Sequence, residues 1–437
     1  MSWLNFFQTQ PSCFKSFGRG INAKIAKDEE EFFNKAYESF EKKEILNAYK
    51  YFFDSLINYT NELSNQNITY EVKDKTLNFI IYQGNAKIHG FTTKEKLYAE
   101  VTMVKKQNAN VALKRYILER NYQFTYINYC SDNEYIKLKL NLDNITMTPQ
   151  KVFYPLRELA LNADFDKEHM LSEFGQTKLE DNEHIQKVQN KELKIKYEFL
   201  HKWIDELNHM IQTLPSDDNL GMQSFLYLNF LFKVDYLIVP KCKIYQNLTK
   251  KLQEYFSDGE TLPEQKNAEL ANYILTLEKL NFEEFSSNFY ESKYTFSQIE
   301  KSTFEEFIHF IETTLVQLRW YKNNRHVQII PTIYSYIALY SLYNYGLNPA
   351  IKKLLHVYIV VINSDYFKAL ECPIYYDKNN NKFFKADIIS QIKDIISGYK
   401  HQYKSLKPFG EELDFSSMND FSNSYFSILK TLDFHEA

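Results

Sequence analysis

The chain has 437 residues, more than one ordinary domain holds, and its 44% hydrophobic and 25% charged residues are typical of a soluble globular protein. Its net charge of −4, with basic and acidic side chains interleaved, excludes the basic surface expected of a nucleic-acid-binding protein. The cysteines Cys13, Cys130, Cys242 and Cys372 form no C-x-x-C pair, so we expect small, unpaired, hydrophobic thiols in a cytoplasmic protein.

Residues 1–27 form an aromatic N-terminal segment without the basic start and apolar run of a secretory signal. Aromatic side chains are unusual in a free tail. We expect the segment to dock on the protein's own surface, because Lys15 and Arg19 supply too little basic charge for a membrane face. Docking on a membrane or on a partner is the alternative. The aromatic residues are Trp3, Phe6, Phe7, Phe14 and Phe17.

Residues 28–174 show a change of hydrophobic period from helical to strand-like and back. Helices are predicted where apolar residues recur every three or four positions, and strands where they alternate. The predicted order is helix 28–43, helix 44–63, strands 77–82, 87–91 and 97–104, helix 109–122, and strands 124–130 and 135–142. A leading strand at 68–72 is left open. A closing helix to about Ala163 begins where Thr148 is the N-cap and Pro149 the first helical residue.

This order predicts an α+β domain in which an antiparallel five-stranded sheet lies against helices. From residue 44 the order is helix, three strands, helix, two strands, helix, which resembles type III secretion chaperones and YbjN-like bacterial proteins. The stretches that carry the resemblance are Leu118–Tyr122, Cys130–Asp132, Tyr135–Leu142, Thr148–Pro149 and Leu156–Asp164. The resemblance implies a non-enzymatic module of the bacterial cytoplasm, often dimeric, that holds other polypeptides through apolar patches and strand pairing.

Residues 175–183 are polar and are predicted to form a linker. Residues 184–437 are predicted to form an all-helical domain, which has no counterpart in those chaperones. Helices are predicted at 184–213, 220–238, 241–257, 264–280, 301–321, 327–346, 350–370, 384–403 and 417–432. A short hairpin is predicted around residues 377–381. The apolar stretch 327–362 contains prolines and polar residues, so it predicts buried helices rather than an integral membrane segment.

The sequence contains no phosphate-binding glycine loop, no nucleophile elbow and no H-E-x-x-H motif. Three Glu-x-x-His pairs occur, at 198/201, 206/209 and 306/309, and such pairs build di-iron sites in helical bundles. Helical geometry places His201, Asp205 and His209 on the polar face, opposite the core. We therefore expect a solvated surface and no cofactor, with a metal on these three residues as the weaker alternative.

The sequence thus predicts a non-enzymatic protein-interaction or holding protein that binds a polypeptide, and a homodimer is left open. The alternatives are a metal-dependent helical enzyme of the di-iron type and a membrane-associated scaffold. Candidate partner-binding residues lie on the expected solvent face of the sheet and on the helix that follows its third predicted strand. They are Tyr98, Thr102, Val104, Tyr116 and Arg120.

Overall fold

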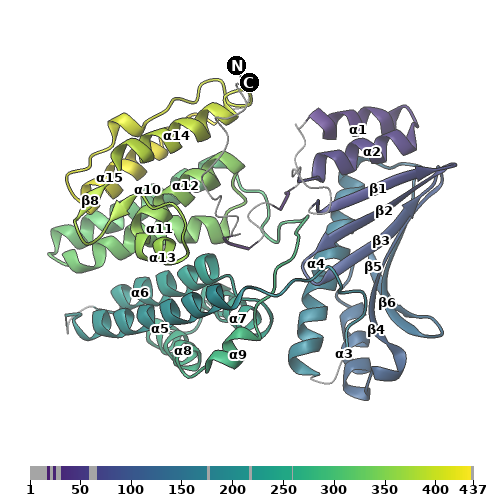
Figure 1. Cartoon of the computed structure of the whole chain (residues 1–437), viewed down its shortest axis with the longest axis horizontal. Coiled ribbons are helices and arrows are strands. Elements are labelled where there is room, and N and C mark those ends of the chain that lie inside the picture. Colours follow the sequence, from purple (N-terminus) through teal and green to yellow (C-terminus); the bar gives the residue numbers. More distant parts are fainter. Residues whose placement is uncertain are drawn as a thin grey trace.

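A computed structural model describes residues 17–19, 23–25, 31–58, 66–174, 178–215, 219–257 and 259–434. An α+β part comes first along the chain, and a mostly helical part follows it (Figure 1). Each part has its own hydrophobic core. The predicted layout of an α+β region followed by a helical region is confirmed in outline.

Helices α1 (Glu31–Glu41) and α2 (Ile45–Leu56) lie side by side at the start of the α+β part (Figure 1). Tyr49, Phe52 and Phe53 of α2 are fully buried, because their spacing places them on one face of the helix. The helix ends earlier than predicted, since Ile57 takes an extended conformation.

The sheet has six strands, all paired antiparallel, in the order β1-β2-β3-β4-β6-β5. Strands β1 to β4 form consecutive hairpins, and the β5–β6 hairpin joins them through β6. The strands are β1 (Ile68–Lys73), β2 (Thr76–Gln83), β3 (Ala86–Thr92), β4 (Lys96–Lys105), β5 (Ile127–Ser131) and β6 (Tyr135–Asp143). The leading strand that the sequence left open is therefore present as β1, so the sheet has one strand more than the five predicted.

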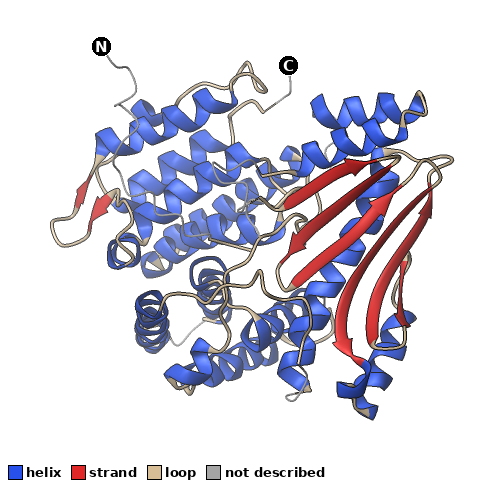
Figure 2. Ribbon diagram, turned by 45° about the vertical axis from the view of Figure 1, so that its right-hand side comes forward, coloured by secondary structure: helices blue, strands red, loops and turns tan. Residues whose placement is uncertain are grey.

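Helices lie behind one face of the sheet, whereas the other face carries no helix (Figure 2). Alternation produces this division: Leu77, Phe79 and Ile81 of β2 are buried, and the residues between them are half-exposed. Gly90 pairs with Phe79 on the neighbouring strand, and a β-carbon at position 90 would lie 2.1 Å from the phenyl ring. The glycine therefore lets this ring pack directly over the backbone of β3.

Helix α3 (Val111–Asn121) precedes β5, and α4 (Pro149–Glu173) closes the α+β part. The predicted start of α4 is confirmed, because the Thr148 hydroxyl accepts a hydrogen bond from the Lys151 N–H and Pro149 is the first helical residue. The helix continues well past the predicted end at Ala163. Charged residues interrupt the apolar pattern there, yet Asp164, Asp166, Lys167 and Glu168 are all buried.

The helical part consists of eleven helices and a short hairpin among the described residues. The helices are α5 (Asn190–Gln212), α6 (Leu220–Lys233), α7 (Cys242–Ser257), α8 (Pro263–Glu278), α9 (Phe282–Ser286), α10 (Phe304–Asn323), α11 (Ile330–Asn344), α12 (Pro349–Ile362), α13 (Ser364–Ala369), α14 (Lys385–Tyr399) and α15 (Met418–Leu429). The predicted hairpin is present as β7 (Tyr376–Asp377) and β8 (Lys382–Phe383). Sequence periodicity missed the single-turn α9.

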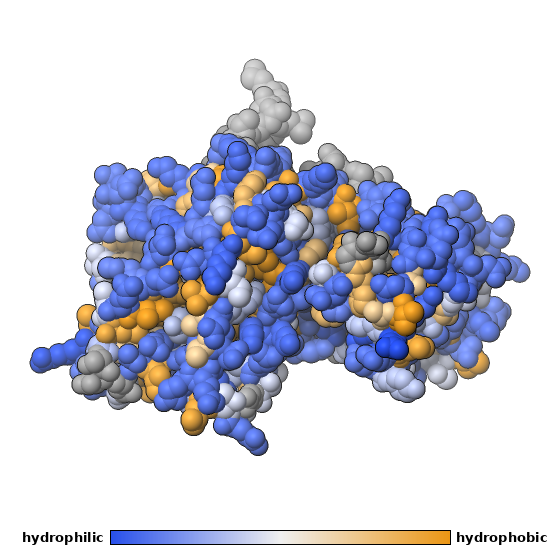
Figure 3. Space-filling view, turned by 90° about the horizontal axis from the view of Figure 1, so that it is seen from below, coloured by the Kyte–Doolittle hydropathy of each residue, from blue (hydrophilic) through white to orange (hydrophobic). Residues whose placement is uncertain are grey.

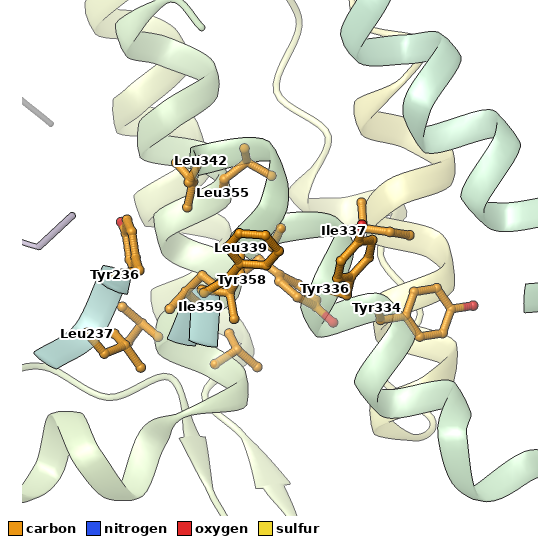
Figure 4. Close-up of a cluster of buried hydrophobic side chains, with 14 of the residues drawn as sticks. Tyr236, Leu237, Tyr334, Tyr336, Ile337, Leu339, Leu342, Leu355, Tyr358 and Ile359 are labelled. Carbon is orange, nitrogen blue, oxygen red and sulfur yellow. The ribbon is translucent and has the colours of Figure 1, made fainter. Parts of the chain in front are cut away.

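Helices α11 and α12 lie at the centre of the helical core, where Tyr358 and Ile359 of α12 approach Leu339 of α11 (Figure 4). Both helices are buried along most of their length, as predicted for the stretch 327–362. Within the described ranges, no helix combines the length and the apolar character needed to cross a membrane. The underside of the molecule is largely hydrophilic, and its apolar patches are scattered (Figure 3).

A segment of the helical part, residues 290–301 between α9 and α10, packs on the α+β part, and we call it the strap. Phe296 of the strap is 1% exposed and belongs to the core of the α+β part, with its ring centroid 5.3 Å from that of Phe153. The Gln83 amide oxygen accepts hydrogen bonds from the backbone N–H groups of Thr295 (3.0 Å) and Phe296 (2.8 Å). The strap thus joins the two parts through buried aromatic and hydrogen-bond contacts.

Candidate functional site

The exposed face of the sheet carries two of the predicted partner-binding residues. Tyr98 and Thr102 on β4 are both half-exposed. The Tyr98 ring stacks on Phe91 with centroids 5.4 Å apart, and the Tyr98 hydroxyl donates to Glu100. Glu100 in turn pairs with Lys137 at 2.9 Å. Charges on this face are therefore largely balanced within the face, and the aromatic pair stands next to them.

Val104 is buried, so the prediction that it lies on the solvent face is wrong. A β-bulge between Thr102 and Val104 shifts the register of β4, and Val104 comes to pair with the buried Ile136. Leu179, from the segment after α4, forms a bridge with Val104 as well. Simple alternation of apolar residues cannot reveal a bulge, because one inserted residue reverses the faces that follow it.

Tyr116 and Arg120, the candidates on α3, are held by a buried carboxylate. Asp166 of α4 is 0% exposed and accepts hydrogen bonds from the hydroxyls of Tyr116 (2.6 Å) and Tyr129 (2.7 Å) and from the Arg120 Nε (2.9 Å). The Arg120 guanidinium also lies over the Phe124 ring, 4.7 Å from its centroid. These contacts fix α3 on α4, so both side chains already serve the fold.

The turn between β2 and β3 is the point where the two parts meet, and we call this region the junction. The Gly84 N–H donates to the Lys293 carbonyl at 2.9 Å. The Gly84 carbonyl accepts hydrogen bonds from the Ser292 hydroxyl (2.6 Å) and the His184 Nε2 (2.9 Å). The Asn85 N–H donates to Asp164 of α4 at 2.7 Å. One hairpin tip thus contacts the strap, the segment after α4, and α4 itself.

Two buried carboxyl groups, Asp164 and Glu168, stand one helical turn apart on α4 at the junction. Glu168 accepts hydrogen bonds from the Tyr290 hydroxyl and from the Cys242 N–H at 3.1 Å. Burial raises the pKa of both carboxyls, and the charge of Glu168 raises the pKa of Asp164 further. Burial lowers the pKa of the nearby Lys241. This concentration of perturbed groups is typical of functional sites.

A small cavity of about 20 Å³ lies beside these groups. It is lined by α4, the β2–β3 turn, the strap and the start of α7, and by Arg19 from the N-terminal segment. The Arg19 Nη2 is buried there without a hydrogen-bond partner. A cavity of this size holds about one water molecule. The junction can therefore store a proton on its carboxyl pair or hold a water, but it is too small to admit an organic substrate.

We expect the stability of the chain to report the Asp164 proton. Its pKa is raised from 3.8 to about 8, so between these values the folded state binds more protons than the unfolded state, and stability falls as pH rises. Asp164→Asn keeps an acceptor for Asn85 and cannot ionise. Relative to wild type, the variant should gain more than about 1.4 kcal/mol between pH 4.5 and pH 8.5 in urea unfolding, the equivalent of one pKa unit.

Glu168, Lys241 and Tyr290 face the same carboxyl in both proteins, so the difference between wild type and Asp164→Asn reports the proton on Asp164 together with its coupling to Glu168. Asp394→Asn, on the exposed surface of α14, is the matched control for replacing a carboxylate by an amide. A constant difference between wild type and Asp164→Asn across this pH range would contradict a proton stored at the junction.

His201, Asp205 and His209, the residues of the weaker metal alternative, are not placed to hold a metal ion. Asp205 and His209 are exposed on α5 and His201 is half-exposed, on the polar face that helical spacing predicts. Within the described residues, no cluster of three or more His, Cys, Asp or Glu side chains is placed to hold a metal ion.

Two further expectations concern the cysteines and the N-terminal segment. Cys130 and Cys242 are free thiols as expected, whereas the prediction of an unpaired thiol is wrong at Cys372, which is disulfide-bonded. Phe17 is buried against the helical part, which agrees with docking on the protein's own surface. The other aromatic residues of this segment lie outside the described residues.

Sequence reasoning missed the junction altogether. Asp164 and Glu168 follow Ala163, where the apolar period of the helix breaks and where the helix was predicted to end. Their one usable signal is the spacing of four, which places both carboxyls on one helical face. The chain matches no protein-family profile, and no curated protein sequence is significantly similar to it.

Proposed function

We propose that this chain is a non-enzymatic polypeptide-binding protein, and that its α+β part holds a partner segment on the exposed face of the sheet. The observation that carries the proposal is a hollow of about 650 Å³ on this face, lined by β1, β2, β3 and β4. A hollow of that volume matches the usual size of binding sites. The sequence of the α+β part resembles secretion chaperones, which bind polypeptides, and this resemblance supports the same proposal.

The lining of the hollow suits a neutral, extended segment with apolar side chains. Ile80, Phe91 and Tyr98 present apolar and aromatic surface, and Phe91 is 39% exposed. Glu100 is neutralised by its lysine neighbours, so the hollow selects no strong charge in its partner. Aromatic side chains with part of their surface exposed are typical anchors of protein interfaces.

A photoreactive phenylalanine analogue at position 91, introduced in the native host, tests this proposal. We expect a covalent adduct with a polypeptide, identified by mass spectrometry. The control is the same analogue at position 256, where Phe256 on α7 is 46% exposed in the helical part and should give no such adduct. With the partner identified, Phe91→Ala should weaken binding about tenfold, the effect of losing one anchor.

Adducts at both positions in equal amount would mean non-specific contact. Adducts at position 256 and none at position 91 would also contradict the proposal. Far-UV circular dichroism of both labelled proteins establishes that each is folded, so that loss of an adduct reports the surface and not the fold.

A further inference from the structure

Residues 17–19 lie in a pocket of the helical part in the manner of a bound peptide. Phe17 is 7% exposed and contacts three rings, with centroid distances of 5.0 Å to Phe367, 5.4 Å to His356 and 6.5 Å to Tyr236. This is an apolar, aromatic pocket that fits one aromatic side chain.

Gly18 makes the turn between the two side chains that flank it. Its φ of +71° lies in the left-handed region, which glycine adopts without strain. Its N–H donates to the carbonyl of Tyr236 at 2.8 Å. Tyr236 belongs to a π-helical turn, Val234–Ile238, that follows α6, and turns of this kind are frequent at functional sites.

Arg19 fills a second pocket beside the first. Its guanidinium carbon lies 4.3 Å from the ring centroid of Tyr245 and 5.0 Å from that of Tyr343, and its Nε pairs with Asp235 of the same π-helical turn. The side chains of Arg19 and Asp235 are 12% and 5% exposed. Two aromatic faces and one carboxylate form the arrangement that selects a planar cation, because the guanidinium can stack and pair at once.

We propose that these two pockets form a recognition site for a segment of a partner polypeptide with an aromatic residue, a glycine and an arginine in succession. Residues 17–19 occupy this site in the free chain and compete with the partner. The contacts of residues 17–19 indicate what the partner segment must carry. It needs an aromatic ring for the aromatic pocket, a glycine in the left-handed conformation, and a guanidinium group that pairs with Asp235. The site lies in the helical part, so it is separate from the hollow of the proposed function.

A synthetic peptide with the sequence of residues 14–22, labelled with fluorescein, tests this proposal by fluorescence anisotropy. The full-length double variant Phe17→Ala/Arg19→Ala leaves both pockets vacant and should bind the peptide saturably. Wild type should bind it at least tenfold more weakly, because its own segment competes. A peptide in which alanine replaces the arginine should lose at least tenfold in affinity for the double variant.

Asp235→Asn, added to the double variant, should lower affinity at least tenfold as well. Arg19→Lys is a milder change that keeps the charge and loses the planar group, so it should give intermediate peptide affinity if the double variant does not fold. Asp394→Ala, at an exposed position on α14 and added to the double variant, should leave peptide affinity unchanged. Failure here therefore leaves the proposed function standing, and failure of the photo-crosslinking leaves this site standing.

Three results would overturn the proposal. The first is no binding to a double variant or Arg19→Lys protein that circular dichroism shows to be folded. The second is equal affinity for a peptide of scrambled sequence. The third is a wild-type dimer that becomes a monomer in the double variant, because the segment would then be exchanged between two copies of this chain rather than compete with a partner.

Discussion

Phe296→Ala is expected to destabilise the sheet of the α+β part, although the residue belongs to the strap between two helices of the helical part. The Phe296 ring is 1% exposed in the core of the α+β part. Truncating a buried phenylalanine to alanine costs about 3–5 kcal/mol. Hydrogen exchange, measured peptide by peptide, should therefore show faster exchange in β2 and β3 than in wild type.

The matched control is Phe256→Ala, because Phe256 is 46% exposed and lies outside that core. It should leave exchange in β2 and β3 unchanged. If Phe296→Ala instead accelerated exchange in α10 and left β2 unchanged, the strap would belong energetically to the helical part alone. The outcome thus decides whether the two cores are coupled through this one ring.

Asp166→Ala is the second change with a large expected effect. The carboxylate is fully buried and accepts hydrogen bonds from Tyr116, Tyr129 and Arg120. Its removal leaves the Arg120 Nε and two tyrosine hydroxyls without this acceptor, and breaking a buried ion pair in this way costs about 3–5 kcal/mol. Urea unfolding followed by far-UV circular dichroism should show this loss.

Asp166→Asn keeps one acceptor oxygen and should lose less stability than Asp166→Ala. The double variant Arg120→Ala/Asp166→Ala should lose less than the sum of the single changes, because neither member of the pair is then left alone. Asp394→Ala, at an exposed position on α14, controls for loss of a surface carboxylate. Additive losses for Arg120 and Asp166 would contradict the energetic coupling that their contact implies.

Local periodicity in the sequence predicted most of the helices and strands, because it reflects which residues of a single element are buried. The stripe of α2, the alternation in β2 and the Thr148–Pro149 start of α4 are properties of neighbours in sequence, and each appears in the structure. Val104 was placed wrongly because a single inserted residue in β4 reverses the faces beyond it. No local pattern announces such a bulge.

The junction and the pocket around residues 17–19 could not be predicted, because they are made of residues distant in sequence. Asp164 meets Asn85 and Tyr290, and Arg19 meets Asp235. Each of these residues reads as an ordinary polar position along the chain. Tertiary contact gives them their role: burial at the junction raises the pKa of Asp164, and Tyr245, Tyr343 and Asp235 together form the arginine pocket.

The strap also determines when the core of the α+β part can be completed during translation. All six strands leave the ribosome before Phe296 does, so the first core stays incomplete while much of the helical part is still being translated. Until then the amide of Gln83 and the backbone of Gly84 lack the partners they have in the finished chain. Completion of the nascent sheet is thereby tied to synthesis of the second half, and release of a truncated product would leave that hairpin tip bare.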